Sequence, residues 1–375
     1  MAEEVNETPR WTVNVPNTIV WAFNPNYIEV TAPQGEDVLP YVDVTIGGNS
    51  IKAALYNGYA KIYISRLLQI CFTNPKTERV KSISVHITGH VKNGAVYWND
   101  DIITTTITAV WGGINLGERA FNFGVYKYDA GHGWLTSHIQ LFVNFPFNLE
   151  LLVANGTTLS RRTNRTPYSQ VGNTYAADQM ITIQKSVILS GITDTRGRTV
   201  VYRQDLSDMN EGGTFDTSFD YTFHTPADTT VITHLHLRQE QEGYYLRWIN
   251  HFGFVNYYLF VNGEKEVKTE RTATIPEDLS MDGMYFGNSE RVVGVKSERN
   301  VKVCAVNLAP DTLNYVRDIV SAPFIDLYIG LDKHGHEIWQ PVRVADGQFL
   351  TKTLHNYLSD FEITIELPNH VTQTI

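Results

Sequence analysis

Two-residue turn signals recur from end to end of this chain, and they constrain its fold more than any other feature. Asn-Gly and Asp-Gly pairs are the strongest short-range hairpin signal, because both residues tolerate the positive φ angles of a type I′ turn. The chain contains six such pairs and three Gly-Gly pairs: Asn57-Gly58, Asn93-Gly94, Asn155-Gly156, Asn262-Gly263, Asp282-Gly283, Asp346-Gly347, Gly47-Gly48, Gly112-Gly113 and Gly212-Gly213. Their distribution predicts a series of antiparallel β-hairpins.

The residues that flank these turns alternate between apolar and polar side chains. Ile83 and Val85 fall on one face of a strand and Ser84 falls on the other, as expected for a sheet with one buried and one solvated side. Around the fourth Asn-Gly pair, residues 257–261 are predicted to turn back and pair with residues 264–275.

Helical signals are few. Apolar residues at three- and four-residue spacing predict a helix over residues 311–320, directly after Pro310, and two shorter ones over residues 64–72 and 352–358. Nothing alternates strand and helix regularly enough for a parallel α/β architecture.

We therefore expect an all-β, mainly antiparallel protein with multiple β-sandwich or barrel-like domains and a few short helices. At 375 residues the chain exceeds one typical domain. Residues 155–178 and 205–215 are the longest candidate loops. Polar and turn-rich breaks suggest an N-terminal β-sandwich at 1–115, a middle β-rich domain with long loops at 116–225, and a C-terminal β domain at 226–375 with one short helix at 311–320.

The composition excludes several classes of protein. A net charge of -10 without any basic block argues against nucleic acid binding. No apolar run is long enough for a membrane span, and the acidic start has no signal-peptide pattern, so we expect a soluble chain without an export signal. Cys71 and Cys304 lie in apolar runs and are interpreted as small buried hydrophobes, with a structural disulfide as the less favoured alternative.

Histidines form the most plausible metal candidates, but their context favours a structural interpretation. His234 and His236 share one face of a predicted strand, ten residues after His224, and that face continues as a solvated surface. His334 and His336 fall in the predicted turn between two strands. We expect no metal, no other cofactor and no catalytic residue.

An aromatic segment at residues 244–260 is the most distinctive stretch of the chain. Both faces of its predicted strands carry large side chains, which indicates either a core strand or a contact between subunits, since Tyr, Trp and Arg are favoured in interfaces. The candidate interface residues are Tyr244, Tyr245, Arg247, Trp248, Tyr257 and Tyr258.

Several segments carry a family resemblance. They are residues 245–250 (YLRWIN), Gly253, residues 257–260, 321–323, Trp339, residues 341–344 and 361–368 and, more loosely, residues 24–30 and 59–65. In these segments the chain resembles a largely uncharacterised group of virion (tail or baseplate) structural proteins of tailed phages and prophages of Bacteroides-like bacteria. The resemblance covers the C-terminal third and, loosely, the first 110 residues. It implies a tail or baseplate component built in copies around the tail axis, and it carries no catalytic residues.

The leading hypothesis is therefore a non-enzymatic structural protein of a bacteriophage virion, at the tail or baseplate. We expect it to form a symmetric homo-oligomer, contact other phage tail proteins and be assembled in the host cytoplasm. The alternative is a carbohydrate-binding receptor-recognition protein, a tail fibre or adhesin, in which Trp134, Trp248 or exposed tyrosines stack on a host-surface glycan. A polysaccharide hydrolase that uses Asp205 and Asp208, or the Asp100-Asp101 pair, is a third hypothesis.

Overall fold

The computed structural model describes most of the chain. The described residues are 11–16, 19–93, 95–115, 127–129, 134–142, 145–153, 158–163, 170–174, 179–193, 199–204, 218–224, 230–238, 242–261, 263–281, 284–345, 351–353 and 357–368. They form an all-β, mainly antiparallel fold with few helices, which confirms the predicted fold class. The strands make five sheets, accompanied by two short α-helices and one 3-10 helix. No helix among these residues has the length and apolar character needed to cross a membrane.

The N-terminal unit, residues 11–115, consists of two sheets that share one core. One sheet has the order β1 (Thr12–Asn14), β3 (Tyr27–Thr31) and β6 (Tyr59–Tyr63). The other has the order β2 (Val20–Trp21), β8 (Val96–Val110), β7 (Val80–Asn93), β4 (Tyr41–Ile46) and β5 (Asn49–Ala54). The predicted alternation is confirmed, because Ile83 and Val85 are buried and Ser84 is exposed.

Glycine-containing turns shape this unit as the sequence predicted. Gly47 and Gly48, with φ angles of 54° and 86°, connect β4 to β5, and Asn57 and Gly58 adopt φ angles of 50° and 75°. These are the left-handed values that a type I′ turn requires. The predicted helix at 64–72 is confirmed as α1 (Ser65–Ile70), which contributes Leu68 to the same core.

The remainder of the chain forms three sheets around a second core. The six-stranded sheet has the order β13 (Gln170–Thr174), β12 (Thr158–Thr163), β16 (Ser218–His224), β17 (Thr230–Arg238), β10 (Trp134–Phe142) and β9 (Lys127–Asp129). The three-stranded sheet has the order β11 (Phe147–Val153), β14 (Gln179–Thr193) and β15 (Thr199–Gln204). The eight-stranded sheet has the order β20 (Lys265–Met281), β21 (Met284–Leu308), β19 (Val255–Val261), β18 (Gly243–Ile249), β22 (Ile325–Leu331), β23 (Glu337–Val344), β25 (Ser359–Leu367) and β24 (Thr351–Thr353).

The second core joins residues from across the chain. Leu141 of β10 and Phe147 of β11 belong to the same buried cluster as Leu246 of β18 and Phe361 of β25. The predicted helix at 311–320 is confirmed as α2 (Pro310–Arg317), followed by the 3-10 helix η2 (Asp318–Ser321). The predicted boundaries at 115 and 225 stay predictions.

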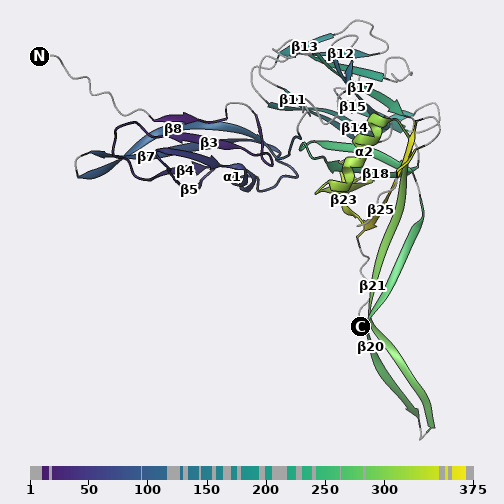
Figure 1. The fold of residues 1–375 in the computed structure, drawn as a ribbon. Helices are drawn as coiled ribbons and strands as arrows, with labels where there is room; N and C mark the ends of the chain where they lie inside the picture. Colours follow the sequence, from purple (N-terminus) through teal and green to yellow (C-terminus); the bar gives the residue numbers. More distant parts are fainter. Residues whose placement is uncertain are drawn as a thin grey trace, which may run out of the picture.

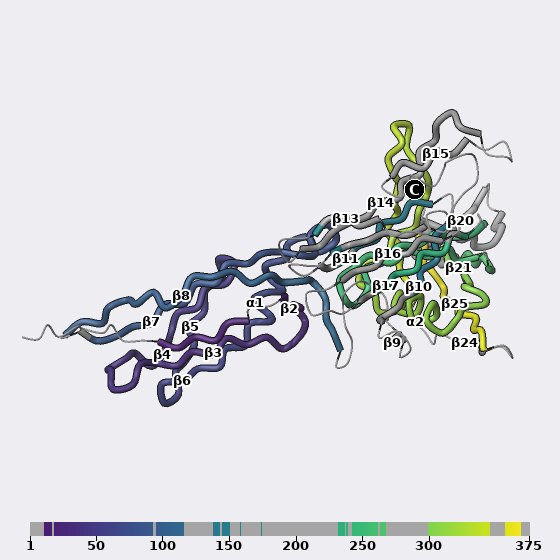
Figure 2. Tube along the Cα trace, turned by 90° about the horizontal axis from the view of Figure 1, so that it is seen from above, coloured from purple at the N-terminus to yellow at the C-terminus, as the bar shows by residue number. Residues whose placement is uncertain are grey.

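The outline of the molecule has two extensions. The N-terminal unit, in purple and blue, reaches away to one side of the remaining sheets in both views (Figures 1 and 2). The ribbon formed by β20 and β21 projects far beyond the rest of the eight-stranded sheet (Figure 1). We call its outer part the arm, residues 268–281 and 284–298, because β21 pairs with β25 only from Arg299 onward.

Three predictions were wrong. Residues 155–178 do not form one long loop, because β12 and β13 lie within them. Residues 257–261 do not pair with 264–275, because β21 lies between β19 and β20 in the sheet. Lys352 is not helical: it pairs with Asp360 of β25, and Tyr357 has a φ angle of 62° that ends any helix.

The cysteines are two separate thiols. Cys71 is buried in the N-terminal core, as predicted, whereas Cys304 is half-buried, and neither forms a disulfide. Burial raises the pKa of the Cys71 thiol.

Candidate functional site

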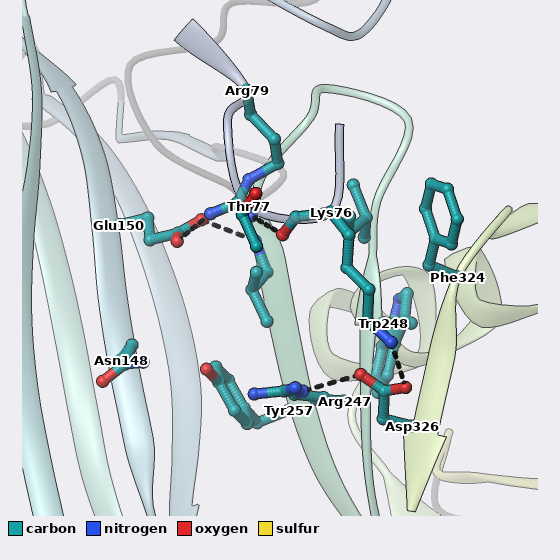
Figure 3. A pocket seen from close by; sticks show the side chains of 12 residues that line it. Lys76, Thr77, Arg79, Asn148, Glu150, Arg247, Trp248, Tyr257, Phe324 and Asp326 are labelled. Carbon is teal, nitrogen blue, oxygen red and sulfur yellow. Dashed lines mark hydrogen bonds and ion pairs between the residues drawn. The ribbon is translucent and has the colours of Figure 1, made fainter. Parts of the chain in front are cut away.

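A charged cavity lies where the N-terminal unit meets the other sheets (Figure 3). Its volume of about 320 Å³ is at the lower end of the range for small-molecule sites. It is lined by Lys76, Thr77, Arg79, Asn148, Glu150, Arg247, Trp248, Ile249, Val255, Tyr257, Phe324 and Asp326.

The cations and acids of this cavity come from different parts of the chain. Lys76 and Arg79 follow α1 in a tight turn in which Thr77 and Glu78 donate their backbone N–H groups to the carbonyl of Asn74. The acids lie on β11 and β22, across the boundary between the two units. Each ion pair described below therefore connects sequence-distant elements.

Arg79 and Glu150 form a buried ion pair. The Arg79 guanidinium donates to Oε1 of Glu150 and, through Nη1, to the carbonyl of Lys76 at 2.8 Å. Oε2 of Glu150 accepts the backbone N–H of Val255 at 2.9 Å. Burial raises the pKa of Glu150, although Arg79 and the Val255 amide oppose that shift. Both carboxylate oxygens are thus occupied.

Asp326 forms the second bridge between the units. Its Oδ1 lies 2.6 Å from Nζ of Lys76, and its Oδ2 accepts from Nε of Arg247 at 3.0 Å. The Arg247 guanidinium also lies 4.1 Å from the centre of the Trp339 ring, a cation–π contact. Arg247 is therefore fixed between a carboxylate and an aromatic face.

This arrangement fits a joint between two units. Each carboxylate oxygen of Glu150 and Asp326 has a hydrogen-bond or ion-pair partner, so both carboxylates are held in place at the junction. Buried ion pairs contribute little net stability but penalise misaligned packing, since an unpaired buried charge is costly. We therefore interpret the pairs as fixing how the N-terminal unit docks.

Two glycines allow the same junction to close. A Cβ atom on Gly112 would overlap the backbone carbonyl of Phe252, and one on Gly253 would overlap the carbonyl oxygen of Trp111. The adjacent Gly113 donates its N–H to the carbonyl of His251 at 2.6 Å. The backbones thus approach as closely as only glycine permits.

Substituting Gly112→Ala should lower the free energy of unfolding by about 1–3 kcal/mol, because the added methyl group forces the two backbones apart. Gly113→Ala is the matched control, since its Cβ would meet only ordinary contacts at 3.5 Å or more. Urea denaturation of both variants measures the difference. Equal effects at the two positions would contradict the close approach.

The six candidate interface residues divide by burial. Tyr245, Trp248, Tyr257 and Tyr258 are at most 5% exposed and pack inside this chain, whereas Tyr244 and Arg247 are half-buried. The Tyr245 hydroxyl donates to the carbonyl of Pro146 at 2.6 Å, and burial raises the pKa of Tyr258 to about 12. Of the two interpretations of this segment, the burial of four residues favours the core strand.

The structure brings together a histidine cluster that the sequence only partly indicated. His138 of β10 stands in register with His234 of β17, with ring centres 4.6 Å apart, and its Nδ1 lies 2.9 Å from Nε2 of His236. His224 lies opposite Thr230, away from this cluster. Sequence reasoning missed His138, because it lies 98 residues from His236 and only the parallel pairing of β10 with β17 makes them neighbours.

The other candidates are placed as follows. In the described part of the chain, no group of three or more His, Cys, Asp and Glu side chains is arranged to hold a metal ion.

His334 and His336 lie in the predicted turn, where Asp332 accepts both of their backbone N–H groups. Asp100 and Asp101 lie on β8, and Trp134 begins β10. Asp205 and Asp208 lie outside the described residues.

Comparisons with known proteins give little. No family model and no curated protein sequence matches the chain. Among solved structures, one match is a chain from a study of how a 1.5-MDa bacterial ice-binding adhesin is retained at the host cell surface. It is 12% identical, the match covers 90% of this chain and 97% of that one, and the TM-score is 0.19. A TM-score this low does not establish a common fold.

Proposed function

We propose that this chain is a non-enzymatic structural component of a bacteriophage virion, at the tail or baseplate, where it forms a symmetric homo-oligomer and contacts other tail proteins. The resemblance of residues 245–250 and 361–368 to such proteins is the reason for naming the tail. The observation that carries the proposal of assembly is the arm.

The arm needs a partner to be stable. Its two strands pair over residues 268–281 and 284–298, and in the described part of the chain they pair there only with each other. A two-stranded ribbon without a covering layer is at best marginally stable in water. Its long edges also present unpaired N–H and C=O groups, which are templates for another chain. Assembly with another chain would cover both the faces of the ribbon and its unpaired edges.

The sequence of the arm suits this role. In the strand register Lys268 stands opposite Glu298, and Glu270 stands opposite Lys296. The far end is apolar instead. Residues 279–286 contain Leu279, Met281, Met284, Tyr285 and Phe286. A projecting segment that ends in large apolar residues favours contact with another protein.

The size of the arm matches a specific interface. Strands of this length extend roughly 45–50 Å, and a ribbon two strands wide has two faces of about 500 Å² each. Covering both faces buries about 1,000 Å² on each copy, compared with about 800 Å² per partner in a standard interface. If every copy donates one arm and receives one, the contacts are head-to-tail, and they form a ring when the rotation between neighbouring copies closes.

Light scattering during size-exclusion chromatography tests the proposal. We expect the full chain to have the mass of an oligomer, an integer multiple of 42.5 kDa that is at least twofold. A variant in which residues 270–296 are replaced by Asn-Gly should shift to the monomer mass, because a neighbouring copy then has no arm to bind. Asp282→Asn, which keeps a turn-forming pair at the end of the arm, is the control and should remain oligomeric.

Two results would contradict the role of the arm. One is a full chain that stays at 42.5 kDa at every concentration tested. The other is a shortened variant that keeps the mass of the full-length oligomer. Circular dichroism of the shortened variant checks that its remaining sheets are folded.

A further inference from the structure

The sheet β1–β3–β6 of the N-terminal unit has two chemically different faces. Its inward residues are small or aliphatic, such as Ile28 and Ile62, and are buried in the core. On the opposite face four tyrosines are exposed by 40%, 82%, 42% and 53%, and we call them the tyrosine platform: Tyr27, Tyr56, Tyr59 and Tyr63. Four exposed tyrosines gathered on one face form an aromatic patch, and such patches mark interaction sites.

The strand register fixes how the platform is laid out. Tyr27 stands opposite Tyr63, with ring centres 5.6 Å apart. Tyr56 forms a bridge pair with Tyr59, and directly opposed residues of antiparallel strands share a face. Tyr59 and Tyr63 are four residues apart on β6, which separates the two pairs by roughly 13 Å. The platform therefore offers two aromatic positions in a row.

Polar groups lie between the two aromatic positions. Lys61 and Glu29 are directly opposed and form an ion pair of 3.2 Å, and Nζ of Lys61 also lies 4.6 Å from the centre of the Tyr27 ring. Lys61 and Tyr59 lower the pKa of Glu29. The charges cancel, so the face provides hydrogen-bonding groups without a net charge that would attract an ionic ligand.

We propose that the tyrosine platform binds a neutral polysaccharide chain, with sugar rings stacked on the two tyrosine pairs and their hydroxyl groups hydrogen-bonded by Lys61 and Glu29. Aromatic faces pack against the C–H faces of a pyranose ring, while phenol, ammonium and carboxylate groups bond its hydroxyls. Two aromatic positions along one strand suit a chain of sugars better than a single one.

The outward face of β3 and β6 combines aromatic and polar groups. Their aliphatic residues point inward, so a ligand meets phenol rings with Lys61 and Glu29 between them, the combination that suits the ring faces and hydroxyls of sugars. This face lies on the N-terminal unit, apart from the arm (Figure 1). The proposal therefore goes beyond the structural role and holds whether the chain is oligomeric or not.

A glycan array with the full chain tests the platform. The probes are maltohexaose, cellohexaose, laminarihexaose and mannohexaose, together with purified neutral surface polysaccharide, and alginate and heparin serve as acidic comparisons. We expect binding to at least one neutral probe, and a loss of roughly tenfold or more in affinity in the Tyr27→Ser/Tyr63→Ser variant. Tyr357→Ser removes a tyrosine that is 83% exposed outside the platform and should bind as the wild type does. Tyr63→Trp should retain binding.

Three results would overturn the proposal. They are no binding to any neutral probe at millimolar concentration, binding only to the acidic polymers, and neutral-probe binding that survives the double substitution. Tyr27 and Tyr63 are 40% and 53% exposed, so losing their ring contact should cost no more than about 1 kcal/mol, and thermal unfolding checks that the variants stay folded. The arm-shortened variant, tested in parallel, separates loss of assembly from loss of binding.

Discussion

Replacing Glu150 with alanine will lower the free energy of unfolding by about 3–5 kcal/mol, the cost of leaving a buried charge without its partner. The Glu150 side chain is 7% exposed and that of Arg79 is 9% exposed, so both charges are largely shielded from bulk water. Nε of Arg79 is already buried without a hydrogen-bond partner. Removing Glu150 would therefore leave a second part of the same guanidinium without a partner. Urea denaturation followed by fluorescence measures the change.

Two further variants separate the ion pair from general damage. The double variant Arg79→Met/Glu150→Leu should recover most of the lost stability, since it removes both charges and keeps the volume. Asp37→Ala removes an acid from an exposed ion pair with Lys92 and should change stability by less than about 1 kcal/mol. The interpretation of the junction fails if Glu150→Ala costs no more than Asp37→Ala.

Substituting Trp248→Ala will lower the free energy of unfolding by about 3–5 kcal/mol, because it empties a large volume of the second core. Trp248 is 1% exposed and its ring centre lies 5.8 Å from that of Tyr315 on α2. The loss should be independent of protein concentration, since these contacts lie within one chain. Thermal unfolding at several concentrations measures it.

Trp248→Phe is the matched control for this position. It keeps most of the aromatic volume and removes an Nε1–H that is buried without a hydrogen-bond partner, so it should cost much less than alanine. A destabilisation by Trp248→Ala that disappears as the concentration rises would instead place Trp248 in a subunit interface.

Local signals predicted the local parts of the fold. Asn57-Gly58 and Gly47-Gly48 adopt the positive φ angles that their composition favours, and the alternation around Val85 gives the correct buried face. Pairing between distant strands was not predictable in this way. Residues 158–163 and 170–174 are mostly polar, and they form strands in the structure because β12 pairs with β16 and β13 pairs with β12.

The candidate site shows the same limit. Sequence reasoning selected Arg247 and Trp248 because they lie in a distinctive aromatic segment. It did not select Lys76 or Arg79, which acquire their roles from acids 250 and 71 positions away. No local pattern records such pairs, since docking of the two units alone brings them together.

Under the proposal a phage or prophage encodes this chain, and locating the chain in particles purified from that phage tests the central claim most directly. Peptide mass spectrometry should find the chain in intact particles. Electron microscopy of those particles should place it at the tail or baseplate in symmetric copies, with each arm against a neighbouring chain. Absence of the chain from intact particles would contradict the account.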